Sequence, residues 1–266
     1  MLKRMALHPP HPIALVTGGS RGIGSAIAAE LASRGAQVAL HYHSNRAAAE
    51  AVLGSLAGTG HLLVCADLAD GAATLRLWAE VSDTLGSVDV VVNNAGIFLD
   101  HPPLIASYDI WQELWQRTLA TNLVGPANLS FLAAQSMSAR KQVVNSAFGR
   151  GRIVNVSSRG AFRGEPDAPA YGASKAGLNA LSQSLAKALA ARDVYVFCVA
   201  PGWVETEMAK ASLSGPKGAA ILGEHPLGRI NRMDEIANAV VYCALDAPGA
   251  MTGSIIDVNG ASYLRT

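Results

Sequence analysis

The sequence lacks three features that would each place it in a specialised class of protein. Its 266 residues carry a formal net charge of only +1, which argues against a general nucleic-acid binder with its basic surplus. No segment reaches the roughly 18 consecutive apolar residues that indicate a transmembrane helix. Cysteine occurs only at Cys65, Cys198 and Cys243, far apart and in apolar surroundings. These positions predict buried free thiols in a reducing compartment, the cytoplasm.

Metal-ligand spacing and a signal peptide are missing too. The seven histidines and three cysteines are scattered, so we expect no metal site of the kind used by metal-dependent alcohol dehydrogenases. Residues 1–12 contain three prolines and no long apolar stretch, which predicts a flexible lead-in. Half of the residues are hydrophobic, enough for a sizeable core. With no linker-like composition break, residues 13–266 are predicted to form a single domain.

Short apolar runs alternate with longer helical patterns along the chain. The runs are rich in valine and isoleucine, as is typical of strands buried on both faces of a parallel sheet. They cover Ile13–Thr17, Gln37–Tyr42, Leu62–Ala66, Val88–Val92, Arg152–Val156, Val194–Val199 and Ser254–Val258. The helical patterns cover Gly22–Arg34, Arg46–Ala57, Gly71–Leu85, Trp111–Ala139, Tyr171–Arg192 and Asp234–Leu245. This alternation predicts an α/β fold, a doubly wound Rossmann-type parallel sheet with helices on both faces.

A glycine-rich turn follows the first predicted strand. It reads Thr17-Gly18-Gly19-Ser20-Arg21-Gly22-Ile23-Gly24 and leads directly into a helical pattern. Glycines at this turn let the backbone approach a pyrophosphate, and the helix N-terminus offers unpaired N–H groups to the phosphates. A tight strand-to-helix connection is the alternative for such a turn taken alone. Its place after the first strand favours a nucleotide site.

The end of the second predicted strand bears on which nucleotide binds. An NAD site normally carries an acidic residue about 20 residues beyond the glycine turn. The chain has no acid from Val38 to Arg46, where it reads His41-Tyr42-His43-Ser44-Asn45-Arg46. Hydroxyl, amide and guanidinium groups there, with Arg21 in the turn, would accept a 2′-phosphate. The pattern therefore predicts NADP(H), the alternative being that Arg46 only caps a surface helix.

Polar residues also follow the third and fourth predicted strands. Asp67-Leu68 places a carboxylate where an adenine amino group would lie, although Asp67 could instead cap the next helix. Asn93-Asn94-Ala95-Gly96 suits a strand end at which backbone passes close to a ligand, although a plain turn explains it too. Because parallel strands end at one edge of the sheet, we expect both segments beside the glycine turn.

Tyr171 and Lys175 stand four residues apart in a strong helical pattern, a spacing that puts both side chains on one face of a helix. A lysine cation beside a phenol favours the phenolate, so we expect it to lower the tyrosine pKa. Upstream, a strand ends in Ser157-Ser158, and a serine hydroxyl there would stabilise charge on a substrate oxygen. Each feature is common alone, but together after consecutive strands they predict a catalytic site.

With these motifs in this order, the chain resembles the classical short-chain dehydrogenase/reductase family, from about Ile13 to Arg265. The matching segments are the turn at 17–24, Asp67, Asn93–Gly96, Asn122 in Ala120–Leu123, Ser158, Tyr171–Lys175, Pro201–Thr206 and Thr252–Gly260. The resemblance implies that Tyr171 is the general acid in reduction and the general base in oxidation. It implies that Lys175 lowers the tyrosine pKa and binds the nicotinamide ribose.

The same resemblance implies roles for two further residues. Ser158, chosen over Ser157 because it lies thirteen residues before Tyr171, would orient and polarise the carbonyl. Asn122 would hold a water that links the lysine to a proton relay, and Gly125-Pro126 just after it fits an interrupted helix. The family pattern also implies a homotetramer built partly from the helices that contain Asn122 and Tyr171.

The resemblance extends to the cofactor site. His43 matches the position that helps set NADP(H) preference, and Val204 and Thr206 match positions that hold the nicotinamide carboxamide. The full set of predicted cofactor-binding residues is Gly18, Ser20, Arg21, Gly22, Ile23, Gly24, His43, Ser44, Asp67, Leu68, Asn94, Ala95, Gly96, Tyr171, Lys175, Pro201, Gly202, Val204 and Thr206.

Among subfamilies, the chain most resembles bacterial 3-oxoacyl-acyl-carrier-protein reductases, which implies a 3-oxoacyl thioester substrate, possible delivery by acyl-carrier protein, and fatty acid biosynthesis. A sugar, polyol, steroid or other ketone is the alternative substrate. A non-catalytic NADP sensor is a distant alternative because such a protein would be expected to lose Tyr171 or Lys175. Residues 205–229 are predicted to form a mobile substrate lid. The longer segment 135–151 and the strand start after it carry Arg140, Lys141, Arg150 and Arg152, and either a solvated basic loop or a contact for an acidic carrier explains them.

Overall fold

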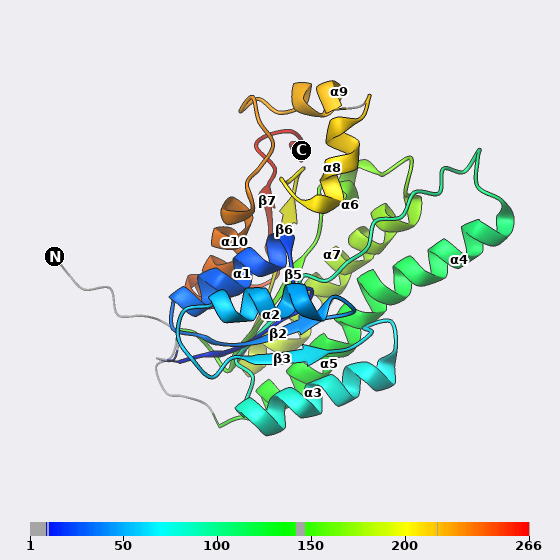
Figure 1. Cartoon of the computed structure of the whole chain (residues 1–266). Helices are drawn as coiled ribbons and strands as arrows, with labels where there is room; N and C mark the ends of the chain where they lie inside the picture. The colour runs from blue at the N-terminus through cyan, green and yellow to red at the C-terminus, as the bar shows by residue number, and fades with distance from the viewer. Residues whose placement is uncertain (1–8, 10, 142–146, 217, 266) are drawn as a thin grey trace.

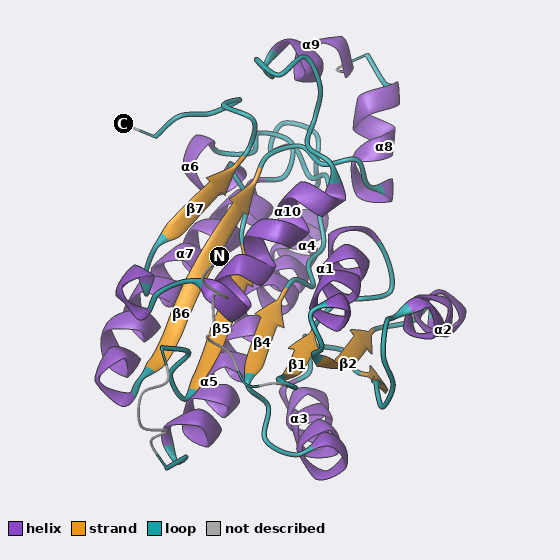
Figure 2. Ribbon diagram, turned by 90° about the vertical axis from the view of Figure 1, so that its left-hand side faces the viewer, coloured by secondary structure: helices purple, strands orange, loops and turns teal. Residues whose placement is uncertain are grey.

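The computed structural model describes residues 9, 11–141, 147–216 and 218–265. Its centre is a parallel sheet of seven strands in the order β3-β2-β1-β4-β5-β6-β7 (Figure 2). The strands are β1 (Ile13–Val16), β2 (Gln37–Tyr42), β3 (Leu62–Cys65), β4 (Val90–Asn93), β5 (Gly151–Val156), β6 (Val194–Pro201) and β7 (Ile255–Val258). All neighbouring strands pair in parallel. The prediction of a doubly wound parallel sheet is confirmed.

Helices cover both faces of the sheet, which explains why its strands are almost continuously apolar. α1 (Gly22–Ser33), α2 (Arg46–Ser55) and α10 (Met233–Val241) pack on one face, and α3 (Gly71–Leu85), α5 (Gly125–Ser138) and α7 (Pro169–Leu189) on the other (Figure 1). Each face has its own cluster of buried apolar side chains. Ile27 and Val240 belong to the first cluster, Leu129 and Val81 to the second, and all four are fully buried. The sheet thus holds two hydrophobic cores apart, and its strand ends are left for a ligand.

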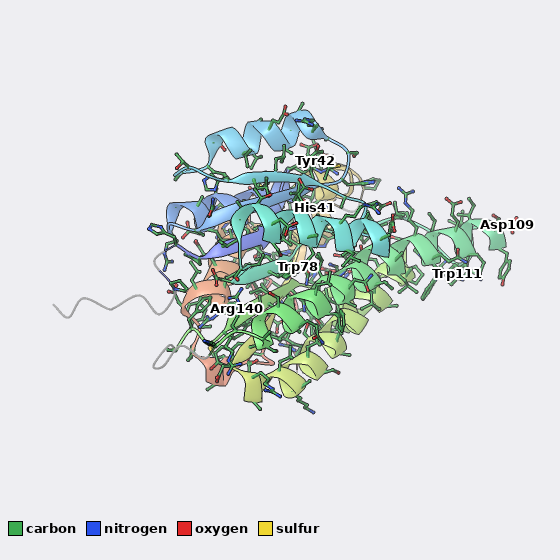
Figure 3. All side chains as sticks on the ribbon, turned by 90° about the horizontal axis from the view of Figure 1, so that it is seen from below. His41, Tyr42, Trp78, Asp109, Trp111 and Arg140 are labelled. Carbon is green, nitrogen blue, oxygen red and sulfur yellow. The ribbon has the colours of Figure 1, made fainter. Side chains whose placement is uncertain are left out.

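The predicted helix Trp111–Ala139 is interrupted, as Gly125-Pro126 suggested. It consists of α4 (Tyr108–Leu119), a π-helical turn at Ala120–Val124, and α5. α4 begins at Ser107, whose hydroxyl accepts a hydrogen bond from the Ile110 N–H. Its outer end, with Asp109 and Trp111, projects well beyond the sheet (Figure 3). The widened turn places Asn122 in the interior of the protein, where it is fully buried.

Three short helices were not predicted. α6 (Gly160–Arg163) follows the strand that carries Ser158, and α8 (Glu207–Ser214) and α9 (Gly218–Gly223) lie in the segment predicted as a lid. They are short, and the last two are rich in alanine, glycine and serine, so their apolar periodicity is too weak to detect. The lead-in 1–12 lies outside the described residues except for Pro9, His11 and Pro12.

One sequence expectation about side chains is wrong and a second holds only in part. Cys198 and Cys243 are buried free thiols as predicted, but Cys65 is exposed, because it ends the edge strand β3. In the segment 135–151, of which 142–146 lie outside the described residues, Lys141 is exposed but the two arginines bind other protein groups. The Arg140 guanidinium forms a 2.7 Å ion pair with Asp89, the residue directly before β4. Arg150 donates to the Ser138 carbonyl at 2.9 Å.

Arg152 shows the same inward orientation. It is fully buried at the start of β5, its guanidinium lies 4.7 Å from the Phe148 ring centroid, and it donates to the Cys243 carbonyl at 2.9 Å. Burial lowers the pKa of Arg152 to about 10. These arginines hold the amino end of β5, whereas ligands of such sheets bind at the carboxyl end. Neither a solvated basic loop nor a carrier contact describes these three arginines, whereas for the exposed Lys141 both remain predictions.

Candidate active site

A cleft of about 600 Å³ opens at the carboxyl ends of the strands. It extends across β1 and β4, the neighbours at which the strand order reverses, and this is where open α/β sheets bind their ligands. Every predicted cofactor-binding residue lies on its wall, as do Ser158, Tyr171 and Lys175. Asn122 does not line the cleft. Of the predicted site residues, the structure therefore brings all but one to a common surface.

The glycine turn after β1 is shaped by backbone conformation. Gly18 and Gly22 have φ angles of +63° and +59°, values that a side chain disfavours. A Cβ at Gly24 would lie 2.2 Å from the Gly18 carbonyl oxygen, so α1 can approach the turn this closely only without a side chain. α1 has no acidic residue in its first turn. Its N-terminus therefore offers N–H groups and a partial positive charge to an anion.

His41, in β2, supports this turn from beneath. The Gly18 N–H donates to its Nδ1 at 3.1 Å, and its Nε2 lies 3.0 Å from the Ala66 carbonyl oxygen. Burial lowers the pKa of His41 to about 4, so the ring is neutral, with Nδ1 as acceptor and Nε2 as donor. Sequence reasoning did not assign His41 this role. A histidine inside an otherwise apolar strand is the only signal for it.

The part of the cleft beside the ends of β2 and β3 carries polar side chains but few charges. His43, Ser44 and Asn45 follow β2 and line the cleft with Arg21. Asp67 lines it from the end of β3, 3.9 Å from the His43 ring. α3 is capped by Asp70 instead, so the alternative in which Asp67 caps that helix is wrong.

Arg46 is turned away from this site. It is the first residue of α2, where the cap is Asn45, and it forms a 2.7 Å ion pair with Glu50 one turn along the helix. The guanidinium available on the cleft wall here belongs to Arg21. The β2 loop therefore has no carboxylate, as the sequence indicated. Of the two arginines considered there, Arg21 lines the cleft and Arg46 does not.

Asn94 joins β4 to the glycine turn. Its backbone N–H donates to the Thr17 hydroxyl and its side-chain amide donates to the Thr17 carbonyl, both at 2.9 Å. Two residues on, a Cβ at Gly96 would lie 3.3 Å from Asn122 Oδ1 and 3.4 Å from Lys175 Nζ. Gly96 thus allows the asparagine amide and the lysine ammonium to approach the same stretch of backbone.

Tyr171 and Lys175 lie on one face of α7, as the four-residue spacing predicted. Lys175 Nζ is 5.7 Å from the centre of the Tyr171 ring and donates to the Val156 carbonyl at 2.9 Å. The Phe98 ring meets the tyrosine edge-on at 4.9 Å. Ser158 Oγ accepts from the Gly160 N–H at 3.0 Å. A phenol, a hydroxyl and an ammonium therefore meet beside the cleft.

Burial dominates the titration of these groups in the protein alone. It raises the pKa of Tyr171 to about 12, against a smaller lowering by the Ser158 hydroxyl. It lowers the pKa of Lys175 to about 8. The direction of the tyrosine pKa shift is opposite to the lowering expected from the ammonium, because burial removes the phenolate from water. The phenol is protonated at neutral pH and is ready to donate.

Asn122 is held rigidly behind this group. Its side-chain oxygen accepts from the Ile97 N–H at 2.8 Å, and its amide donates to the Ile97 carbonyl at 2.9 Å and to the Ser174 hydroxyl at 3.2 Å. All of its side-chain bonding is thus directed to protein groups. Its predicted part in a proton relay remains a prediction.

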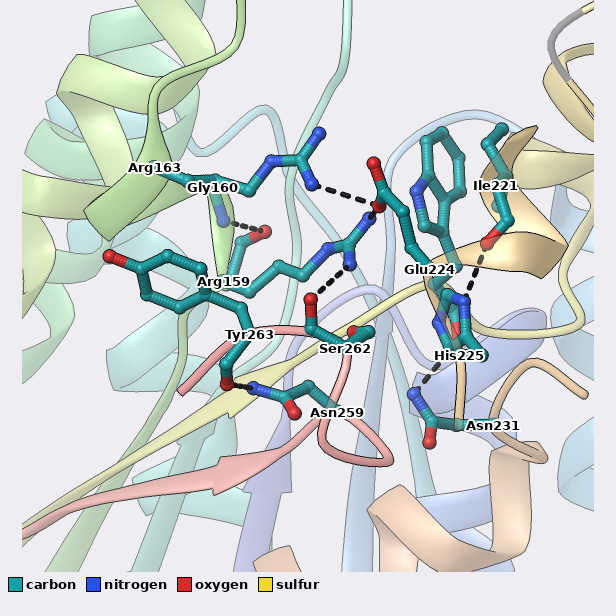
Figure 4. Close-up of polar contacts among 12 residues, drawn as sticks. Arg159, Gly160, Arg163, Ile221, Glu224, His225, Asn231, Asn259, Ser262 and Tyr263 are labelled. Carbon is teal, nitrogen blue, oxygen red and sulfur yellow. Dashed lines mark hydrogen bonds and ion pairs between the residues drawn. The ribbon is translucent and has the colours of Figure 1, made fainter. Parts of the chain in front are cut away.

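A charged cluster beyond Ser158 was not found from the sequence. Arg159, almost fully buried, forms a 2.7 Å ion pair with Glu224, and Arg163 binds the same oxygen at 2.9 Å (Figure 4). Arg159 also donates to the Ser262 carbonyl at 3.4 Å. Burial alone would raise the pKa of Glu224, but the two guanidinium groups hold it below its usual value. The cluster connects the serine loop, the segment after α9 and the C-terminal residues, which no local pattern relates.

Two further observations concern the described residues as a whole. No group of three or more histidine, cysteine, aspartate or glutamate side chains there is arranged to hold a metal ion. Across the same part of the chain, no helix combines the length and apolarity needed to span a membrane.

Comparison with known proteins agrees with this geometry. A family model described as enoyl-(acyl carrier protein) reductase matches residues 18–261, and the chain belongs to the short-chain dehydrogenase/reductase family, oxidoreductases that use a nicotinamide cofactor. The 3-oxoacyl-[acyl-carrier-protein] reductase of Haemophilus influenzae is 37% identical over 252 residues, covering 95% of this chain and 98% of that protein. Its Escherichia coli counterpart is 36% identical, with coverage of 95% and 97%. The acetoacetyl-CoA reductase of Rhizobium meliloti is 36% identical, with coverage of 94% and 98%.

Proposed function

We propose that this protein reduces a ketone to a secondary alcohol with NADPH, with Tyr171 as the proton donor. The observation that supports this most strongly is the meeting of Ser158, Tyr171 and Lys175 on the wall of a cleft that also contains a glycine turn and a helix N-terminus. A cleft of about 600 Å³ is within the range of roughly 300–1,000 Å³ typical of ligand pockets.

The residues present fit a dinucleotide. Backbone N–H groups from Ser20 to Gly24 would hold the pyrophosphate, because Gly18, Gly22 and Gly24 leave the backbone open to it. Lys175 would bind the nicotinamide ribose, and Val204 with Thr206 the carboxamide. When bound, the reduced nicotinamide supplies the hydride to the carbonyl carbon.

The chain's own residues would manage the proton. The Ser158 hydroxyl orients and polarises the carbonyl oxygen, and Tyr171 transfers its phenolic proton to that oxygen as charge develops there. A phenol pKa raised to about 12 keeps the proton in place at neutral pH. Lys175 stabilises the resulting phenolate, and Asn122, which approaches the lysine across Gly96, would support proton resupply.

NADPH is proposed over NADH on the character of the loop after β2. Arg21, His43 and Ser44 line the cleft, and the β2 loop carries no carboxylate from Val38 to Arg46. A 2′-phosphate would find donors there, whereas NAD sites place an acid on the ribose hydroxyls. Asp67 also lines the cleft, and we assign its carboxylate to the adenine amino group.

The names of the relatives suggest a 3-oxoacyl thioester as the substrate class, free or on acyl-carrier protein, and hence a part in fatty acid biosynthesis. Sugars, polyols, steroids and other ketones are the alternative class. Residues 205–229 are proposed as the substrate lid. They contain α8 and α9 and supply Thr206, Glu207 and Ala209 to the cleft wall.

A homotetramer and a cytoplasmic location complete the proposal. The segment from the turn before α4 to α5 exposes large apolar side chains, with Leu104 98% exposed and Phe131 60% exposed. Apolar groups at this density favour contact with a second copy of the chain. The three free cysteines suit a reducing compartment. Light scattering of the purified protein would give the oligomeric state.

The decisive test is turnover with and without the proposed proton donor. The purified protein should oxidise NADPH in the presence of an activated ketone such as acetoacetyl-CoA. Tyr171→Phe should reduce kcat by about 100-fold or more while leaving the NADPH dissociation constant nearly unchanged, as measured by nicotinamide fluorescence. Near-normal turnover by that variant would show that another group supplies the proton.

A further inference from the structure

Glu165 is a carboxylate on the wall of the cleft next to the catalytic group. It lies between α6 and α7 and lines the cleft together with Ser158 and Tyr171. Its negative charge contributes to the raised pKa of Tyr171, so the two side chains interact electrostatically. Sequence reasoning gave this residue no role.

The position of the carboxylate relative to Ser158 follows from Gly160. The Gly160 N–H donates to Ser158 Oγ, and a Cβ built on Gly160 would lie 2.3 Å from Glu165 Oε1. One carboxylate oxygen therefore packs against the residue that holds the serine hydroxyl. A substrate carbonyl bound to Ser158 and Tyr171 would carry its substituents within reach of Glu165.

Arg159 and Arg163 form no ion pair with Glu165. Both bind Glu224, and their charges oppose the raised pKa of Glu165 without reversing it. Burial is the larger influence and raises the pKa of the Glu165 carboxyl. Among the described residues, none forms a hydrogen bond or ion pair with this carboxylate. It is partly desolvated and has acceptor capacity to spare.

A carboxylate in this state discriminates between substrates. An apolar chain placed against it would remove its remaining water and return no hydrogen bond, which is costly. A hydroxyl on the carbon next to the carbonyl would donate to it and restore the lost bond. An ammonium at the same place would do so as well, whereas a second carboxylate would be repelled.

From this we propose that Glu165 determines specificity by selecting ketones that carry a hydrogen-bond donor, foremost a hydroxyl, on the carbon adjacent to the carbonyl. The inference rests on the proposed ketone reductase function and refines its substrate. It favours hydroxylated ketones, the oxidised forms of polyols, over unsubstituted acyl chains.

A matched pair of small ketones tests this directly. Hydroxyacetone and 2-butanone differ by a hydroxyl in place of a methyl group, and aminoacetone carries the ammonium. We expect kcat/KM with NADPH to favour hydroxyacetone over 2-butanone by about 10- to 100-fold, the usual effect of a hydrogen bond to a charged group. Since a hydroxyl also activates the carbonyl, the readout is how far this preference changes when Glu165 is replaced.

Glu165→Leu, which removes the acceptor, should reduce the preference for hydroxyacetone by about 10-fold or more, and Glu165→Gln, which keeps the shape, by less. Glu113, an exposed glutamate on α4 outside the cleft lining, provides the control for loss of a negative charge. Glu113→Gln should leave the preference as it is. NADPH affinity and the thermal midpoint report whether each variant is folded.

The outcomes separate this inference from the function on which it rests. If no ketone is reduced, the proposed function fails. Turnover of ketones with a preference that Glu165→Leu does not change would overturn the role of Glu165 alone. An equal loss in Glu113→Gln would also overturn it, because the overall charge of the protein would then explain the preference. A preference for aminoacetone that is lost in Glu165→Leu would identify the favoured donor as an ammonium.

Discussion

The two halves of the cleft are built from different materials. The nucleotide half consists mainly of backbone, with Gly18, Gly22 and Gly24 exposing N–H groups at the start of α1. The substrate half consists of side chains, among them a buried ammonium, a phenol and a carboxylate. A backbone site needs small residues at fixed local spacing. A side-chain site needs particular groups brought together from distant parts of the chain.

The two halves also differ in how they affect the stability of the folded state. His41 beneath the glycine turn is neutral and has partners at both ring nitrogens. Lys175 is buried with a lowered pKa and one hydrogen bond, to the Val156 carbonyl. A buried cation with so little compensation destabilises the folded state at neutral pH. We therefore expect substitutions in the substrate half to trade activity against stability, and those in the nucleotide half to lower both.

Lys175→Met is the sharpest test of that contrast. Reduction should fall by about 100- to 10,000-fold because the phenolate loses its cation. Unfolding should nevertheless become harder. The lowering of the lysine pKa from 10.5 to about 8 means that the buried cation destabilises the folded wild type by about 3 kcal/mol. Losing the hydrogen bond to Val156 costs the variant about 1 kcal/mol. Urea denaturation at pH 7 should thus show a gain of about 1–2 kcal/mol.

The pH dependence of this gain checks its cause. Below about pH 8 the lysine is charged in both the folded and the unfolded state, so the penalty is complete. Between about 8 and 10.5 the unfolded chain binds more protons, and the wild type becomes more stable relative to the variant. The gain should therefore shrink over this range. A variant that is less stable at pH 7, or a gain independent of pH, would contradict the argument.

Gly24→Ala addresses the other half. The new Cβ would lie 2.2 Å from the Gly18 carbonyl oxygen and 2.5 Å from the Asn94 amide nitrogen, so the turn must move. We expect NADPH affinity to fall by about 10- to 100-fold, and unfolding to become easier by about 1–3 kcal/mol. Gly54→Ala in α2 is the control, since nothing lies within 4 Å of its Cβ. It should stabilise the helix by about 0.5–1 kcal/mol. Equal effects of the two substitutions would show that close packing at Gly24 does not make the turn sensitive to a side chain.

The same contrast explains what could be predicted from the sequence. The strands and the glycine turn were predictable because buried parallel strands and a backbone phosphate site both leave local patterns. Tyr171 and Lys175 were predictable because one helix face carries both. The contact between Arg159 and Glu224 was not, because 65 residues separate the partners and each looks like an ordinary surface residue.

Electrostatic balance was predictable only in part. The spacing of Tyr171 and Lys175 shows that they are neighbours, but the direction of the tyrosine pKa shift depends on how completely both are buried. Burial in turn depends on packing by Phe98, from the segment after β4. The position of Glu165 on the cleft wall could not be predicted from the sequence for the same reason. A glutamate in a loop is usually solvated, and only the fold turns this one into the cleft.

His43→Asp changes the character of the nucleotide half without touching its backbone. A carboxylate beside the 2′-phosphate would repel it, and Asp67 is already 3.9 Å from the histidine ring. NADPH binding should weaken by about 10-fold, an effect limited by solvent exposure, while NADH binding should weaken little. His43→Asn introduces a side chain of the same size as aspartate but without its charge, so it separates charge repulsion from the loss of the imidazole ring. Fluorescence titrations at low and high salt would show the repulsion shrinking with salt, and unchanged cofactor selectivity would refute our assignment of the β2 loop.

Glu224→Gln should have the smallest effect, and it tests whether the substrate half depends on contacts that bridge distant segments. Glu224 is bound by Arg159, of which only 3% of the side chain is exposed, and by Arg163, of which 30% is exposed. The substitution leaves the buried arginine without its charge partner, so residues 205–229 should separate more readily from the serine loop. Since Glu224 itself is 40% exposed, we expect a cost of only about 1 kcal/mol, seen as faster limited proteolysis within 205–229 and a KM about 2- to 5-fold higher. Arg163→Gln keeps the buried pair and should change both measurements less. If the two variants were equally sensitive to protease, the buried pair would not be what holds this segment closed.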